Sequence, residues 1–268
     1  MRVLLAALLL TFGTQTARAT DPSKQSVEAL IDDLAIISAS QLGIDDAGIY
    51  RAFLADDTSP QFAVGLFPTH APAVDPAMRE LVRRGVAAVP ALLAHLDDAR
   101  PTRLTVGSKT APLETFGGQF FAEEYDPRNS EPQQIDCFSN NTCRSFEKPY
   151  RVKIGDVCEV LIGQIVNRVL LAVRYQPTAI VLVNSPVETP ALAARIRKDW
   201  QGVDATALEA SLLSDLRSEA ELDDWHGYRA ALVRLRFYYP KTYAALAGDD
   251  LRKRRSFEAE EQKERANQ

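Results

Sequence analysis

The sequence predicts a mainly α-helical protein that carries one long irregular insertion. Apolar residues recur at helical spacing over most of the chain from residue 24 onward. Glycines, prolines and aromatic residues break this pattern between residues 102 and 149. The chain of 268 residues is 46% hydrophobic and 25% charged, which is the composition of a globular protein and excludes collagen-like, disordered and disulfide-dense classes.

Residues 1–19 have the pattern of a secretory signal peptide. Arg2 precedes an apolar run over residues 3–10, and residues 17–19 form a small-x-small cleavage site. This run is too short for a membrane-spanning helix, which needs about 20 residues. We therefore expect residues 20–268 to form a single helical domain in the periplasm or outside the cell, with no membrane span after cleavage.

The first helix of the mature chain is expected at residues 24–38. Its apolar residues follow the i, i+3, i+4, i+7 spacing of an amphipathic helix, and they are Val27, Leu30, Ile31 and Leu34. Ser23 or Ser26 provides its N-cap.

A pair of short helices is expected at residues 75–98. Asp75 and Pro76 are a typical N-cap and first helical residue, and Gly85 interrupts the apolar pattern. The second helix begins near Pro90 and has a complete apolar stripe, formed by Val89, Leu92, Leu93 and Leu96. Two short helices of this kind need neighbouring helices to cover their apolar faces.

Residues 75–98, and Leu81–Asp98 in particular, resemble a unit of the HEAT family of helical repeats. The shared features are the glycine between the helices, the Ala-Val-Pro-x-Leu-Leu start of the second helix and its acidic end. Residues 156–170 are similar, more weakly, to the second helix of another unit, and residues 150–186 resemble uncharacterised secreted bacterial proteins. The resemblance implies a degenerate HEAT-like α-α stack without a regular period, and it implies no activity.

The insertion at residues 102–149 is expected to be a long loop with at most a short hairpin. Its aromatic residues are expected to anchor it, and they are Phe116, Phe120, Phe121 and Tyr125. Long insertions in compact domains are often functional, so this segment is a candidate binding surface. The alternative is a packing flap that covers the core.

The cysteines predict one candidate disulfide. Cys137 and Cys143 flank a turn-rich segment of a secreted chain and are the preferred pair. Cys158 lies in an apolar helical run and is expected to be a buried free thiol. Three cysteines allow three pairings, and the spacing alone does not choose between them.

The second half of the chain is predicted to be largely helical. A strongly apolar helix is expected at 156–172, followed by residues 179–183, which fit either a short strand or a buried helical turn. Further helices are expected at 190–200, 205–217 and 225–239. A last helix begins at residue 243 and continues into a polar tail at about 256–268, with ion pairs such as Arg254 with Glu258.

The sequence lacks the motifs of common catalytic, metal and cofactor sites. It contains neither a Gly-x-Ser-x-Gly elbow nor a His-Glu-x-x-His zinc motif. We therefore expect no metal, no cofactor and no assigned catalytic residue. The formal net charge of −5 argues against a nucleic-acid partner, because phosphate backbones attract basic proteins. One acidic cluster in the insertion could supply an acid and a base, and it contains Glu123, Glu124 and Asp126.

Polar residues fall within the apolar arc of the 156–172 helix. Gln164 and Arg168 lie beside Val157 and Leu161 on a helical wheel. One interpretation is structural, with Arg168 paired to an internal carboxylate that locks neighbouring helices together, because an unpaired buried arginine is costly. The other is a groove that binds a partner's carboxylate or peptide. This groove would be lined by Gln164, Arg168, Arg174 and Gln176.

The function expected from these observations is a non-catalytic interaction or scaffold module with a protein or peptide partner. The alternatives are an enzyme with a carboxylate-based site in the 102–149 insertion and a structural component of the cell envelope. An enzyme should show titratable groups that converge in a deep cleft. A binding module should instead show a shallow groove lined by aromatic, arginine and glutamine side chains. The oligomeric state is left open.

Overall fold

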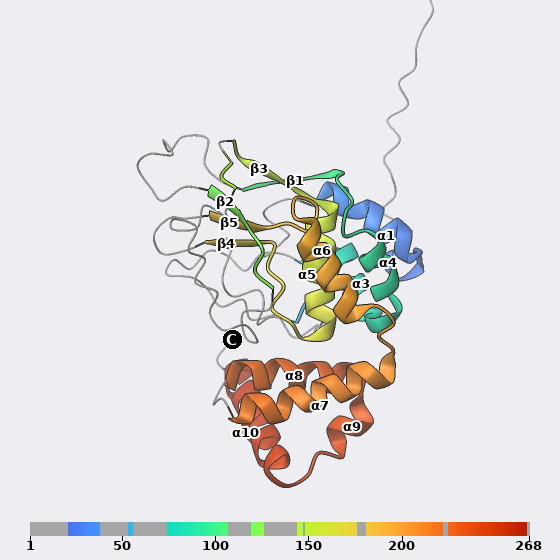
Figure 1. The fold of residues 1–268 in the computed structure, drawn as a ribbon. Coiled ribbons are helices and arrows are strands. Elements are labelled where there is room, and N and C mark those ends of the chain that lie inside the picture. The colour runs from blue at the N-terminus through green and yellow to red at the C-terminus, as the bar shows by residue number, and fades with distance from the viewer. Residues whose placement is uncertain are drawn as a thin grey trace, which may run out of the picture.

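The computed structural model describes residues 21–37, 53–55, 74–106, 119–125, 144–146, 148–175, 181–221 and 225–266. These residues form a mainly α-helical protein with five short strands, which confirms the predicted class at this level. Figure 1 shows α5 between a group of N-terminal helices (α1, α3 and α4) and the strands, with α7 to α10 in a separate layer. The predicted signal peptide, Cys137, Cys143 and Gln176 lie outside the described residues.

The N-terminal helix is shorter than expected and is flanked by 3-10 turns. After a turn at Pro22–Lys24, α1 covers Val27–Asp33 and continues as a 3-10 turn over Leu34–Ile36. The hydroxyl of Ser26 accepts a hydrogen bond from the backbone N–H of Ala29, so Ser26 is the N-cap. The predicted apolar stripe is confirmed, because Leu30, Ile31 and Leu34 are fully buried.

The predicted helix pair at 75–98 is present. Helix α3 covers Pro76–Arg83 and α4 covers Val89–Ala94, with a 3-10 turn at Gly85–Ala87 between them. The Asp75 carboxylate caps α3 by accepting from the backbone N–H groups of Ala77 and Met78. Gly85 has a φ of 57°, and a Cβ at this position would lie 2.9 Å from the Tyr238 ring, so the turn requires glycine on two counts.

The strands correct the expectation that the insertion is a long loop with at most a short hairpin. Strands β1 (Pro101–Val106) and β2 (Gln119–Ala122) both lie in or beside residues 102–149. They do not pair as a hairpin. Instead, β1 pairs antiparallel with β3 (Tyr150–Lys153), and β2 pairs parallel with β5 (Val181–Asn184). Strand β4 (Val173–Tyr175) completes a three-stranded sheet of order β2-β5-β4. Burial alternates along β1, which is the period-two pattern of a strand with one face on the core.

Helix α5 (Ile154–Val166) is buried along its entire length and forms the centre of the core. It ends six residues before the predicted position, because Asn167 adopts the left-handed conformation with a φ of 58°. The chain then turns back onto the helix. A Cβ at Gly163 would lie 2.7 Å from the Arg168 carbonyl oxygen, so glycine permits this close approach.

The C-terminal part follows the predicted pattern more closely. Helix α6 covers Pro190–Trp200, α7 covers Ala205–Glu221 and α8 covers Trp225–Tyr238. Helix α9 covers Pro240–Ala244, and α10 extends over Gly248–Ala266, so most of the expected polar tail is helical. Phe257 is buried inside that segment, under the guanidinium groups of Arg229 and Arg236. The expected ion pair between Arg254 and Glu258 is present at 3.6 Å.

Candidate binding groove

A shallow groove of about 320 Å³ lies between α4 and the C-terminal end of α6. We call it the α4/α6 groove. Helix α4 contributes Val89, Pro90, Leu93 and Ala94, and the α6 side contributes Arg197, Trp200, Gln201, Gly202 and Val203. Most of its walls are apolar, and polar groups lie only on the α6 side.

The shape of the groove follows from the two helices. Val89 and Leu93 are four residues apart in α4 and therefore share one face, which is buried. Pro90 and Ala94 lie next to this face and are exposed, so the groove is open to solvent there. Trp200 is the last residue of α6 and is 8% exposed.

Trp200 is held in place by contacts on two sides. Its indole Nε1 donates a hydrogen bond of 2.9 Å to the hydroxyl of Tyr125, which follows β2. The guanidinium carbon of Arg168 lies 5.4 Å from the centre of the indole, a cation–π distance. The Tyr125 ring is in turn covered by Arg195 at 4.2 Å. The aromatic wall of the groove is therefore a fixed surface.

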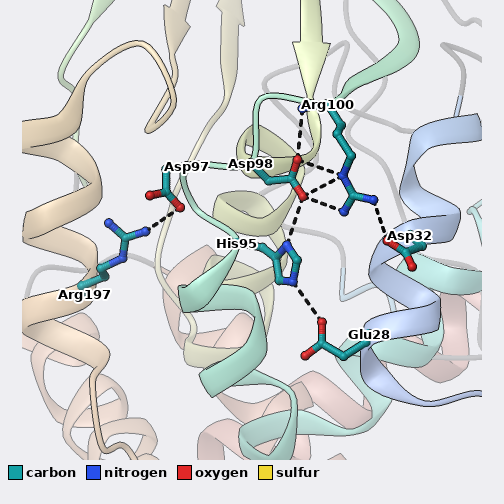
Figure 2. A network of polar contacts seen from close by, with 7 residues as sticks. All are labelled: Glu28, Asp32, His95, Asp97, Asp98, Arg100 and Arg197. Carbon is teal, nitrogen blue, oxygen red and sulfur yellow. Dashed lines mark hydrogen bonds and ion pairs between the residues drawn. The ribbon is translucent and has the colours of Figure 1, made fainter.

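Arg197 places a positive charge at the rim of the groove. Its Nε donates to the carbonyl oxygen of Leu93 at 3.1 Å, and its Nη2 donates to the Asp97 carboxylate at 3.0 Å. Figure 2 shows the two side chains facing each other, with Arg197 coming from α6 and Asp97 from the turn after α4. The guanidinium is thus oriented by α4 while about a third of the side chain stays exposed.

The same turn is also connected to α1. The ring of His95 bonds through Nδ1 to Asp98 at 3.0 Å and through Nε2 to Glu28 at 2.9 Å (Figure 2). Burial lowers the pKa of His95, but the bonds to Asp98 and Glu28 outweigh it, so the pKa is raised. Arg100 bridges Asp98 and Asp32 and completes the network. The residues that orient Arg197 therefore belong to a rigid segment.

The structure describes the side chains of two of the four predicted binding residues, Gln164 and Arg168. Gln164 is 3% exposed, and its side-chain oxygen accepts a hydrogen bond from the backbone N–H of Leu54 at 3.1 Å. Arg174 lies in β4, and Gln176 is outside the described residues. Arg168 follows the end of α5 instead of lying on it, so the wheel that placed it beside Gln164 does not apply.

Arg168 has the geometry of the structural interpretation. Its Nη1 donates to the Asp215 carboxylate of α7 at 2.7 Å, and its Nη2 donates to the Ser211 hydroxyl at 3.0 Å. The side-chain amide of Asn167 bonds to the same carboxylate at 2.8 Å. The side chains of Arg168 and Asp215 are 15% and 12% exposed. We call Asn167, Arg168 and Asp215 the clamp, because they connect the end of α5 to α7 and support Trp200.

A second polar cluster lies at the start of α5. The Asp156 carboxylate accepts hydrogen bonds from the Tyr150 hydroxyl at 2.7 Å, from the Lys153 backbone N–H at 2.8 Å and from the Ser185 hydroxyl. Burial raises the pKa of Asp156 to about 6, although these bonds act in the opposite direction. Glu188 forms an ion pair with Lys153 at the edge of this cluster.

Glu159 lies one turn beyond Asp156 and is fully buried. Neither carboxylate oxygen has a hydrogen-bond partner among the described residues, and burial raises the pKa of Glu159 well above the ordinary value. Perturbed carboxyl groups of this kind are typical of functional sites and of structural networks alike. Asp156 and Glu159 do not line the α4/α6 groove, and both are at most 1% exposed.

The structure describes two of the three carboxylates of the enzyme alternative, Glu123 and Glu124. Glu123 is exposed, whereas the backbone N–H and carboxylate of Glu124 bond to the side chain of Asn184 at 2.9 and 3.2 Å. Asp126 lies outside the described residues, as do both cysteines of the predicted disulfide. Cys158 is confirmed as a buried free thiol. Within the described ranges, no three potential ligands among His, Cys, Asp and Glu gather as a metal site would require.

The α4/α6 groove was missed from the sequence because its walls lie about a hundred positions apart in the chain. The one local signal is at the end of α6, where an arginine, a tryptophan, a glutamine and a glycine follow within six residues, at Arg197, Trp200, Gln201 and Gly202. None of the helices in the described part of the chain is long and apolar enough to cross a membrane.

Comparisons of the chain with protein-family models, with curated proteins and with solved structures found no match. The geometry of the α4/α6 groove and of its supporting contacts is therefore the basis for assigning a function.

Proposed function

We propose that the protein is a non-catalytic interaction module that binds a protein or peptide partner in the α4/α6 groove. The observation that carries this proposal is the lining of the groove, which combines a fixed aromatic side chain, an arginine and a glutamine with apolar walls. Tryptophan and arginine are the residues that most often dominate binding energy at interfaces. The perturbed carboxyl groups lie elsewhere and are buried, so the groove lacks the converging acid and base of a hydrolytic enzyme.

The rigidity of the groove supports the same proposal. Trp200 is held by Tyr125 and the clamp, and Arg197 is held by the backbone of α4. A binding surface whose side chains are already fixed loses little conformational entropy when a partner docks.

The proposal includes a HEAT-type organisation of residues 75–98. Helices α3 and α4, joined at Gly85, both pack on α5, which belongs to the segment that resembles a second unit. Surfaces of helical repeats commonly bind extended partners, and the α4/α6 groove lies on the second helix of this pair.

Photo-crosslinking tests the proposed function. Benzoylphenylalanine at position 94 lies on the wall of the groove, whereas the same residue at position 87 is also exposed but does not line the groove. We expect position 94, and not position 87, to crosslink to one defined segment of a partner in an envelope extract, identified by mass spectrometry. Equal labelling from both positions, or none from position 94, would contradict the proposal.

We also propose that the protein acts in the periplasm or outside the cell. This rests on the signal-peptide pattern of residues 1–19. Sequencing the N-terminus of the protein isolated from its native host tests it. A mature chain that begins at Thr20 is the expected result, and a chain that retains residues 1–19 in the cytoplasm would refute it.

A further inference from the structure

We propose that the α4/α6 groove recognises the free C-terminal carboxylate of its partner, together with an apolar last side chain. This inference rests on the proposed function and adds the chemistry of the ligand. Three features of the groove carry it, namely the unused donors of Arg197, the size of the apolar hollow and the polar groups beside Gly202.

Arg197 is oriented so that it can bind a second anion. Its Nε and Nη2 are engaged by the Leu93 carbonyl and the Asp97 carboxylate, so the guanidinium plane is fixed. Its Nη1 donates no hydrogen bond to any described residue. A guanidinium presents its donors as a planar fork that matches a carboxylate. The group therefore offers an oriented cation with unused donors at the edge of an apolar hollow.

Asp97 does not prevent this interaction. Its side chain is 71% exposed, and an exposed ion pair of this type contributes little to stability. An incoming carboxylate can share the guanidinium or replace Asp97 at little cost. Asp97 nevertheless repels a second negative charge, so its removal should strengthen binding of an acid and leave binding of a neutral ligand unchanged.

The size of the groove favours a chain end over a long lipid. Its volume of about 320 Å³ lies at the lower end of the range for small-ligand sites, roughly 300–1,000 Å³. Pro90 and Ala94 are the exposed apolar residues of this lining, whereas Val89, Leu93 and Trp200 are at most 8% exposed.

The polar groups on the α6 side fit a peptide. Gln201 is exposed, and its side-chain amide bonds to no described residue. Gly202 is also exposed, and a Cβ at this position would meet no atom within 4 Å, so its backbone is accessible. Amide and backbone groups beside a carboxylate-binding arginine complement the last peptide bonds of a chain.

The fluorescence of Trp200 can be used to measure binding of peptides to the groove. The chain has two tryptophans, so a Trp225→Phe variant of residues 20–268 reports on Trp200 alone. The probes are acetyl-Gly-Gly-Leu with a free carboxylate and the same peptide with a C-terminal amide. We expect a saturable change in fluorescence with the acid. The amide should bind at least about tenfold more weakly, because it cannot form the charge-assisted hydrogen bonds of a carboxylate.

Variants of α6 supply the controls. Arg197→Gln should abolish the preference for the acid, and Arg197→Lys should restore it only in part, since lysine lacks the fork. Lys198→Gln makes the same change of charge at an exposed neighbour outside the groove and should have no effect. Asp97→Asn should strengthen binding of the acid only. Circular dichroism of each variant verifies that it is folded.

Two results would overturn the inference and can be told apart from failure of the proposed function. Equal binding of acid and amide would show that the carboxylate is not recognised, while the groove still binds. If Leu, Phe, Val and Ala peptides all leave Trp200 unchanged, recognition of chain ends is refuted. The crosslinks from position 94 then decide the proposed function separately.

Discussion

Removal of the buried charge of Asp156 should change how the stability of the protein depends on pH. The ordinary pKa of this carboxyl group is 3.8, and in the folded protein burial raises it to about 6. Between these values the unfolded chain has released a proton that the folded chain still binds. The free energy of unfolding must therefore decrease as the pH rises, because the stabilising contribution is fully present below pH 3.8 and is lost as the pH passes through about 6.

The magnitude follows from the two pKa values. One pKa unit corresponds to about 1.4 kcal/mol, so the whole difference for Asp156 amounts to about 3 kcal/mol, of which about 2.5 kcal/mol falls between pH 4 and pH 7. Asp156 is 1% exposed, so solvent screening does not reduce this figure much. Glu159 acts in the same direction, and each of the two carboxyl groups affects the other.

A Glu159→Gln background separates the two groups. We would compare Glu159→Gln with the double variant Asp156→Asn/Glu159→Gln by urea unfolding at pH 4, 5, 6 and 7. The double variant loses a hydrogen bond to Tyr150 or Ser185 and should be less stable at pH 4. From pH 4 to pH 7 the difference between the two curves should change by about 2.5 kcal/mol in favour of the double variant. Parallel curves would refute the reasoning, because they would mean that Asp156 titrates alike in both states.

Four further predictions concern stability. Asp215→Ala should destabilise the protein by about 3 kcal/mol because it leaves Arg168 largely buried without its partner. Arg168→Met/Asp215→Leu should cost less than the sum of the single changes in urea unfolding, and strict additivity would contradict the clamp. Gly85→Ala should lower the melting temperature more than Gly248→Ala, because both have positive φ but only Gly85 faces a ring. Equal decreases in melting temperature for the two variants would show that the contact with Tyr238 does not destabilise Gly85→Ala. The bonds to Asp98 and Glu28 raise the pKa of His95 in the folded protein, so their contribution to stability is lost as the pH rises through that pKa. His95→Gln should therefore remove a loss of stability that the unmodified protein shows above pH 6.5. Melting curves at pH 6 and pH 8.5 test this, and an unchanged difference between them would count against it. Glu159→Met should stabilise the protein by about 1–3 kcal/mol at pH 7, because it removes a buried carboxyl group that has no hydrogen-bond partner among the described residues, and a loss of stability would contradict this reason.

The helices could be predicted from the sequence because their signals are local. Asp75 and Pro76 mark the start of α3, and Pro190 marks the start of α6. The exception is the end of α5. Apolar residues continue past Val166, so the periodicity predicts a longer helix than the one that Asn167 ends in the left-handed conformation.

The sheets could not be predicted in the same way because their pairings are remote. Strand β2 pairs with β5 about 60 positions later, and β1 pairs with β3 across most of the insertion. A strand of four to six residues has too little periodicity of its own to stand out among prolines and glycines. Each of these strands is stabilised by its pairing with a remote strand, and that pairing can be seen only in the folded structure.

The predicted binding residues and the observed groove are nevertheless connected through Trp200. Arg168 was chosen because a polar side chain within an apolar pattern must find a partner, and it does so in Asp215. Its guanidinium then lies against the indole that forms one wall of the groove. A site needs supporting contacts that keep its side chains within a fraction of an ångström of their binding positions. Arg168 is thus better understood as a residue that positions Trp200 than as one that contacts a partner, and Arg197, which approaches the same groove from α6, is the arginine that remains accessible to a ligand.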